Sequence, residues 1–244
     1  MTEVSAAAAS ASPHKSLLGR AIGIIVSPRA TYADLVELPR VLGAVLVCLA
    51  LLTGATVAFL STEVGRRAVL DQQVQQAEAF GQPMNDAQYE QLERFAPYFG
   101  YFGAAFQAFF IVIGSLVLAL LAMAVFNAFL GHDATFKQAW AVVVHSGFVL
   151  VLAPLFVLPL NYIRESMTSP TTLAVFLPFL EENSFLGHVF GAIDLFYVWW
   201  LVNLAIGLGV LYKRRTGPIA TVLMCVYVAL AIVIAGVRQA LSGA

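Results

Sequence analysis

The chain has 244 residues, of which 60 % are hydrophobic and only 11 % are charged, and its formal net charge is -1. This composition excludes a large soluble domain, and the nearly neutral charge gives no indication of a nucleic-acid-binding face. Five apolar stretches without Lys or Arg dominate the sequence: residues 41–60, 102–130, 140–162, 189–212 and 219–237. Each is long enough to cross a hydrocarbon core of about 30 Å as a helix. We therefore predict an all-α polytopic membrane protein whose five-transmembrane-helix bundle covers residues 41–237.

The region before the first span divides into a tail and a helical segment. Residues 1–13 form a low-complexity Ala/Ser tract, which we expect to be disordered. In residues 14–40, apolar side chains recur at helical spacing over too short a length to span the bilayer. This pattern predicts a cytoplasmic amphipathic helix at the membrane interface. Its interfacial anchors are expected to be Leu17, Leu18, Ile22 and Ile25.

The connection between the first two spans, residues 61–101, is predicted to be an external pair of helices. Two apolar helical stripes are separated by Gly81-Gln82-Pro83, and Asn85 or Asp86 is the expected N-cap of the second helix. Six acidic residues make this insert negative. It can be a solvated cap over the bundle or a site for a partner or an ion, and the sequence leaves both interpretations open.

The third span, residues 140–162, contains Pro154 and Pro159 and is expected to be kinked. Its continuation, residues 168–182, carries an apolar run broken by Pro178. We expect this piece to follow the membrane interface or to be re-entrant.

The distribution of cations predicts the orientation in the membrane. Eight Lys and Arg residues fall on the side of the N-terminus and five on the other side. The run Lys213-Arg214-Arg215 directly follows a span and is the strongest local signal for the cytoplasm. We expect a cytoplasmic N-terminus and an external C-terminus.

Two ionisable residues within the spans, Asp194 and His145, are the candidate polar site. At about 1.5 Å per residue, Asp194 lies roughly 28 Å and His145 roughly 12 Å from the cytoplasmic face, so the two side chains are not expected to meet. Asn203 is the expected partner of His145. The expected partners of Asp194 are Gln107, Asn161 and Arg164. Each ionisable residue can lock the bundle by hydrogen bonds, and Asp194 can alternatively form an ion, proton or lipid-headgroup site.

Three passages carry a family resemblance. They are Ser27-Pro28-Arg29-Ala30-Thr31-Tyr32 with Pro39, Thr135-Phe136-Lys137-Gln138-Ala139 with His145-Ser146, and Ile193-Asp194-Leu195-Phe196 with Trp199 and Gly207-Leu208-Gly209. In this order and with five spans, the chain resembles the Yip (Ypt-interacting protein) family in its bacterial form, over roughly residues 15–237. The resemblance implies a cytoplasmic N-terminus, a compact five-helix bundle and no known catalysis. Eukaryotic relatives are tied to small trafficking GTPases, but the long charged N-terminal region of those relatives is mostly absent here, which argues against a small GTPase partner.

The sequence therefore favours a non-enzymatic scaffold of the bacterial inner membrane that contacts lipids, other membrane proteins or a second copy of itself. No metal cluster, phosphate-binding glycine loop or nucleophile with matched partners is recognisable, so no cofactor or metal ion is expected. The alternative is a translocator of a small solute, an ion or a lipid, with Asp194 as its polar centre.

Overall fold

The computed structural model describes residues 15–79, 81–130, 133–181 and 184–241, so the expected Ala/Ser tail, residues 1–13, lies outside the described part. The described chain is helical, as predicted. Its elements are α1 (Leu17–Val26), α2 (Pro28–Glu37), α3 (Leu42–Leu60), α4 (Glu63–Ala79), α5 (Asp86–Phe95), the 3-10 helix η1 (Ala96–Tyr98), α6 (Phe99–Leu130), α7 (Phe136–Ser146), α8 (Phe148–Arg164), the 3-10 helix η2 (Leu173–Phe176), α9 (Phe185–Ala192), α10 (Leu195–Leu211) and α11 (Thr216–Leu241).

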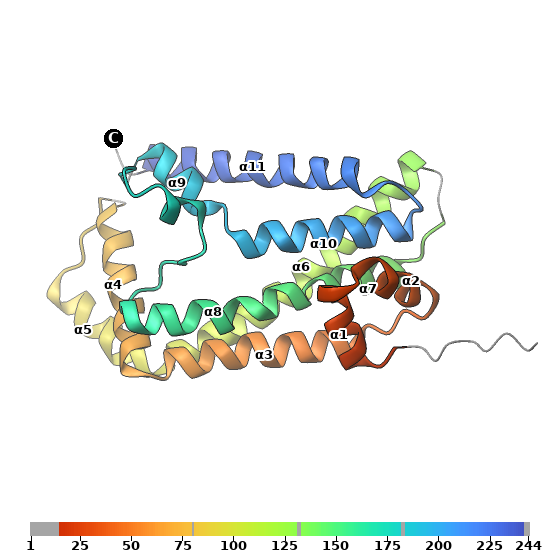
Figure 1. Ribbon diagram of the computed structural model, residues 1–244. Helices are drawn as coiled ribbons and strands as arrows, with labels where there is room; N and C mark the ends of the chain where they lie inside the picture. The colour runs from red at the N-terminus through yellow and green to blue at the C-terminus, as the bar shows by residue number, and fades with distance from the viewer. Residues whose placement is uncertain (1–14, 80, 131–132, 182–183, 242–244) are drawn as a thin grey trace, which may run out of the picture.

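The long helices lie side by side in an elongated bundle (Figure 1). Helices α3, α6, α7 with α8, α10 and α11 each run between its two ends. Four helical stretches of the described chain are long and apolar enough to cross a membrane: Leu42–Leu60, Asp86–Ala128, Phe136–Arg164 and Thr216–Ala240. The fifth run, α10, has 17 residues and is a shorter apolar helix. Its length of about 26 Å lies just below a typical hydrocarbon thickness.

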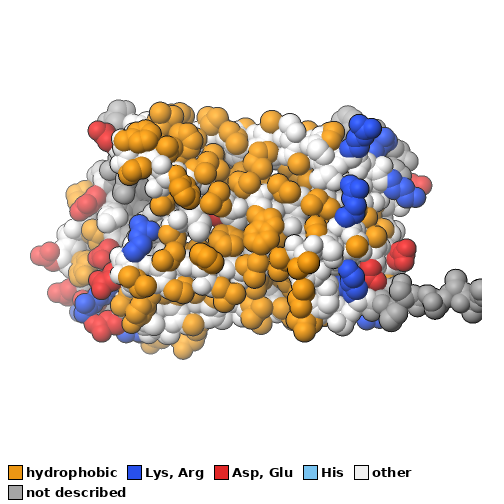
Figure 2. All heavy atoms as spheres, in the orientation of Figure 1, with side chains coloured by type: hydrophobic (Ala, Val, Ile, Leu, Met, Phe, Trp, Pro, Cys, Tyr) orange, Lys and Arg blue, Asp and Glu red, His pale blue; other side chains and the backbone are white. Residues whose placement is uncertain are grey.

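The two ends of the bundle differ in charge (Figure 2). Lys and Arg side chains gather at the end formed by α1, α2 and the turn between α10 and α11, which we call the basic end. Asp and Glu are concentrated at the opposite end, where α4, α5 and α9 lie, and which we call the acidic end. Apolar side chains cover the surface between the two ends, as expected for a protein with lipid as its solvent around the middle.

The insert between the first two predicted spans is the expected pair of helices, α4 and α5. Gly81 between them has φ +68°, a left-handed conformation that glycine adopts without strain. Asn85 is the N-cap of α5: its side chain accepts a hydrogen bond from the backbone N–H of Gln88, and the Gln88 side chain accepts one from the N–H of Asn85. This reciprocal pair is a capping box.

The third predicted span begins earlier than its apolar run and is divided near its middle. Thr135 caps α7 through a second capping box with Gln138, and Pro154 and Pro159 lie inside α8. The division between α7 and α8 falls at Gly147, whose N–H donates to the carbonyl of Val144 at 3.0 Å.

The fourth predicted span is not one continuous helix, which corrects the sequence prediction. Residues 189–192 belong to α9, the chain is extended at Ile193 and Asp194, and α10 begins only at Leu195. An isolated antiparallel bridge between Asp194 and Thr172 fixes the break.

Helix α10 lies at the centre of the bundle and packs against α2, α7, α8 and α11. Its buried residues alternate between large and small side chains: Leu201, Asn203, Leu204, Ala205, Gly207, Leu208, Gly209 and Leu211. A Cβ at Gly207 would lie only 2.6 Å from Cγ1 of Val142 and 2.8 Å from Cε1 of Tyr32. The missing side chain therefore allows α2 and α7 to approach α10 closely.

Helix α1 has an outward apolar face and an inward face that the sequence analysis did not identify. Leu18 and Ile22 are 70 % and 54 % exposed, whereas Arg20, Gly23 and Ile24 are buried. The interfacial location of the exposed face stays a prediction.

Candidate functional site

Asp194 is held by three hydrogen-bond donors from its own chain. One carboxylate oxygen, Oδ1, accepts from the backbone N–H of Phe196 at 2.8 Å, which makes Asp194 the N-cap of α10. The other, Oδ2, accepts from Ser169 Oγ at 2.8 Å and from Thr171 Oγ1 at 2.6 Å. A carboxylate also interacts favourably with the positive end of a helix. These contacts tie the loop before η2 to the start of α10.

Backbone contacts complete this cluster at the acidic end. The N–H of Leu195 donates to the carbonyl of Thr171 at 3.0 Å. The Tyr227 hydroxyl of α11 accepts from the N–H of Asp194 at 3.0 Å and donates to the carbonyl of Ala192 at 2.9 Å. We call Ser169, Thr171, Asp194 and Tyr227 the Asp194 cluster. It joins the loop before η2, α10 and α11 at the helix break.

The partners expected for Asp194 lie elsewhere, and this part of the prediction was wrong. Gln107 accepts a hydrogen bond from Thr56 Oγ1 at 2.8 Å and links α6 to α3. Asn161 is buried in α8. Arg164 is exposed and forms no ion pair among the described residues.

His145 and Asn203 are both buried but make different hydrogen bonds. The Nδ1 atom of His145 lies 2.8 Å from the carbonyl oxygen of Ala141 one turn earlier, and the ring contacts Phe148 edge to face. Asn203 accepts from the Tyr32 hydroxyl at 3.4 Å. Asn203 therefore links α10 to α2, and in the described chain it forms no hydrogen bond with His145, contrary to expectation.

Burial affects the Tyr32 hydroxyl that makes this link. Tyr32 has no exposed surface, and burial raises the pKa of its hydroxyl above the ordinary value of 10.0. The group therefore remains protonated at physiological pH and keeps its hydrogen available for Asn203.

The sequence analysis missed a second polar cluster, at the basic end. Arg20 is 1 % exposed, and its Nε donates to Asp34 Oδ2 at 3.0 Å, so an ion pair joins α1 to α2. Lys15 Nζ donates to Thr31 Oγ1 at 2.8 Å beside this pair. We call Lys15, Arg20, Thr31 and Asp34 the Arg20 cluster. The available signal was the recurrence of Ser16, Arg20, Gly23 and Ser27 on the face of α1 opposite its apolar stripe.

Both clusters bind one part of the chain to another. Three donors already occupy the carboxylate of Asp194, and the Arg20 guanidinium is paired with Asp34. No group of three or more His, Cys, Asp and Glu side chains that could hold a metal ion occurs in the part of the chain that the structure describes. The geometry thus gives these clusters a structural role in fixing the ends of the helices.

Comparison with known proteins gives the family. No match was found among curated proteins or among solved structures. A family model described as the Yip1 domain matches residues 22–237. The match begins within α1 and includes both polar clusters except Lys15 and Arg20, and it extends almost to the end of α11. The match confirms the family found in the sequence: the chain belongs to the Yip1 domain family.

Proposed function

We propose that this protein is a non-enzymatic membrane scaffold that organises lipids or other membrane proteins around its outer surface, without a cofactor or metal ion. The observation that carries the proposal is how little of the long helices is buried within the chain. In the most apolar stretches of Leu42–Leu60, Asp86–Ala128 and Thr216–Ala240, only 17 %, 11 % and 17 % of the residues are buried, against 44 % in Phe136–Arg164. Most of the apolar surface is therefore free to contact lipids or other helices.

Helix α6 offers an aromatic surface of this kind, formed by Tyr101, Phe102, Phe106, Phe109 and Phe110, all of which are exposed. Phe106 and Phe110 are exposed with their ring centroids 4.7 Å apart, and Phe109 lies edge to face with Phe110 at 5.6 Å. Aromatic side chains supply large contact areas for few rotatable bonds, so they are efficient anchors for a protein partner. We propose that this face of α6 contacts other membrane proteins or a second copy of the chain.

We further propose that the chain crosses the membrane five times, with α10 as the crossing that falls short of the usual length. The burial of α10 among its neighbours and the placement of α1 and the end of α11 at opposite ends of the bundle support this topology (Figure 1). The concentration of cations at the basic end supports a cytoplasmic N-terminus and an external C-terminus in a bacterial inner membrane.

Translocation through Asp194 has less support. The carboxylate accepts hydrogen bonds from Ser169, Thr171 and Phe196, so a passing ion would have to displace donors that the fold supplies. An arrangement of this kind favours stability over transport.

Photo-crosslinking in native membranes tests the scaffold proposal. A benzophenone analogue of phenylalanine replaces Phe106, which is 66 % exposed, and in a matched control it replaces Phe148, which is 4 % exposed. We expect discrete protein adducts on irradiation of the Phe106 variant and none from the Phe148 variant. Purification of the adducts then identifies either another membrane protein or a second copy. The same analogue is then placed at Phe109 and at Phe110. Absence of discrete protein adducts from all three α6 variants would overturn the proposal for protein partners.

A further inference from the structure

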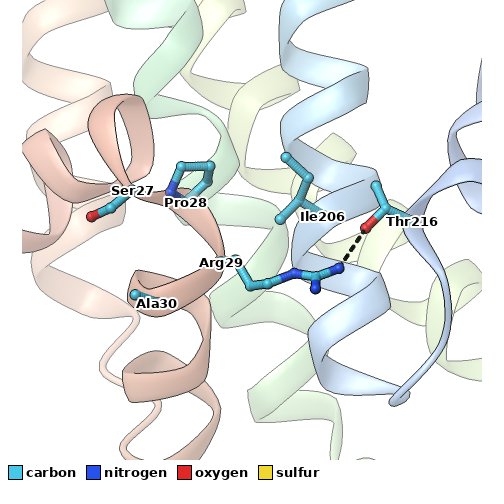
Figure 3. A pocket seen from close by; sticks show the side chains of 6 residues that line it. All are labelled: Ser27, Pro28, Arg29, Ala30, Ile206 and Thr216. Carbon is cyan, nitrogen blue, oxygen red and sulfur yellow. Dashed lines mark hydrogen bonds between the residues drawn. The ribbon is translucent and has the colours of Figure 1, made fainter.

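A hollow of about 500 Å³ lies at the basic end between one helix near the N-terminus and two consecutive helices near the C-terminus. The helices are α2, α10 and α11, and the lining residues are Ser27, Pro28, Arg29, Ala30, Ile206 and Thr216 (Figure 3). The Arg29 side chain extends from α2 across the hollow toward α11, and its Nη2 lies 3.5 Å from Thr216 Oγ1. A guanidinium and a hydroxyl thus face the same space from opposite sides.

The neighbouring turn holds three more cations close to the start of α11. Lys213 adopts a left-handed conformation with φ 51°, and the N–H of Arg214 donates to the carbonyl of Gly209 at 2.8 Å. This bond closes the end of α10 in a Schellman-type turn. A Cβ at Gly209 would lie 3.1 Å from the carbonyl oxygen of Arg214, so the glycine allows the turn to fold tightly against α10.

No acidic side chain of the described residues forms an ion pair with these cations. Within the described residues, the ion pairs involve Arg20, Arg67 and Arg94, and neither Arg29 nor any residue of the Lys213–Arg215 run takes part in one. The first turn of α11 adds the backbone N–H groups of Thr216 and Gly217, since Pro218 has none, and free N–H groups at a helix start favour an anion. Arginine is also well suited to phosphate, because its planar guanidinium can donate two parallel hydrogen bonds.

Apart from Ser27, the rest of the hollow is lined by apolar residues, and this distinguishes a lipid from a free anion. Pro28, Ala30 and Ile206 form its walls, and the neighbouring Val26 is 76 % exposed. The hollow lies between α2, α10 and α11 at the basic end. On the face drawn in Figure 2, the apolar surface of the bundle meets the Lys and Arg side chains at that end. Only an amphiphile, with an anionic headgroup and hydrocarbon chains, would use both the cations and the apolar wall.

We propose that this hollow is a binding site for the headgroup of an anionic phospholipid. The phosphate is held by the Arg29 guanidinium and the Thr216 hydroxyl, the Lys213–Arg215 turn supplies additional positive potential, and the acyl chains follow the apolar surface beside Ile206. This inference rests on the proposed scaffold function and names the lipid class and the site for one of its contacts.

Native mass spectrometry of the full-length protein in mild detergent, followed by titration with a fluorescent lipid, tests the site. The probes are phosphatidylglycerol, phosphatidylcholine with the same acyl chains, and inorganic phosphate as a competitor. We expect phosphatidylglycerol to bind more tightly than phosphatidylcholine, and inorganic phosphate at lipid-equivalent concentration not to displace it. Equal affinity for the two lipids would overturn the proposal, and full displacement by inorganic phosphate would replace it with a small-anion site.

Substitutions locate the binding. Arg29→Gln is expected to weaken phosphatidylglycerol binding about fivefold, the effect of one basic residue at an anionic membrane surface. The matched control is Arg40→Gln, which removes an exposed cation at the same end that does not line the hollow. Because the attraction between a cation and the headgroup falls off within a Debye length, this control should change the affinity less than twofold. Ala30→Glu places a negative charge at an exposed lining position and should weaken binding further, so the test does not depend on one variant.

Equal effects of Arg29→Gln and Arg40→Gln would show diffuse attraction to the basic end and would overturn the site. Circular dichroism melting of each variant verifies that it folds. The lipid site and the scaffold proposal fail independently: loss of lipid preference would leave the Phe106 adducts of α6 intact, whereas absence of those adducts would leave the lipid titration unchanged.

Discussion

The close approach of α10 to α2 and α7 depends on Gly207, and Gly207→Ala tests it. The added Cβ would lie 2.6 Å from Cγ1 of Val142 and 2.8 and 2.9 Å from two ring atoms of Tyr32. Carbon atoms normally pack at about 3.5–4.0 Å, so each contact is too short by roughly 1 Å. Neither neighbour can move away cheaply, because both are fully buried and the valine side chain is branched at Cβ.

Two opposing effects set the magnitude. Overpacking a filled core costs about 1–3 kcal/mol. Replacing a helical glycine by alanine returns up to about 1 kcal/mol of helix propensity. We therefore expect the free energy of unfolding to fall by about 1–2 kcal/mol in the Gly207→Ala variant.

Unfolding in SDS mixed micelles, followed by tryptophan fluorescence, measures this change. Gly114→Ala in the middle of α6 is the matched control, because no atom lies within 4 Å of the position its Cβ would take. The control should be unchanged or stabilised by up to about 1 kcal/mol. Val142→Ala in the Gly207→Ala background removes the closest atom and should restore part of the loss. Stabilisation of Gly207→Ala to the same extent as the control would refute the packing argument.

Three further substitutions test the polar clusters and α1. Asp34→Ala leaves Arg20 buried without this carboxylate and should lower the free energy of unfolding by about 3–5 kcal/mol in the same SDS titration. Replacing both residues by apolar ones should cost less. A loss below about 1 kcal/mol for Asp34→Ala would contradict a buried ion pair. Asp194→Ala removes a helix cap and the acceptor of two hydroxyl groups, so we expect the free energy of unfolding to fall by about 2–3 kcal/mol, and by a smaller amount for Asp194→Asn. Wild-type stability of the alanine variant would show that the Asp194 cluster does not hold the helix break. Leu18→Glu with Ile22→Glu changes only exposed positions, so it should change the free energy of unfolding by no more than about 0.5 kcal/mol and leave membrane insertion intact in a carbonate-extraction assay. A variant that fails to insert would place this face of α1 inside the bundle.

The sequence predicted the features that depend on local chemistry. Four of the five apolar stretches correspond to helical stretches long enough to cross a membrane, because length and hydropathy alone make a lipid-exposed helix stable. The capping residue Asn85 and the break at Gly81 follow from interactions within a few residues, so they were visible without knowledge of the rest of the fold.

The features that the sequence did not predict depend on distant partners. The break in the fourth span uses the hydroxyl groups of Ser169 and Thr171, which are 25 and 23 residues before Asp194, and apolar composition conceals it. The burial of Arg20 depends on Asp34, which lies 14 residues later in the chain and pairs with it. The hydrogen-bond partners of a side chain in a bundle depend on which helices pack beside it, and the spacing of residues along one helix does not specify that packing.

Cysteine accessibility is the most direct test of the central claim, a five-crossing bundle with its basic end in the cytoplasm. In a background with Cys48 and Cys225 replaced by serine, single cysteines at the exposed positions Glu181, before α9, and Gly217, after α10, bracket the shortest crossing. The account predicts that a membrane-impermeant maleimide labels the cysteine at position 181 in intact cells and the one at position 217 only after the membrane is opened. Labelling of both positions from the same side would contradict the crossing by α10, and labelling of position 217 alone in intact cells would reverse the orientation.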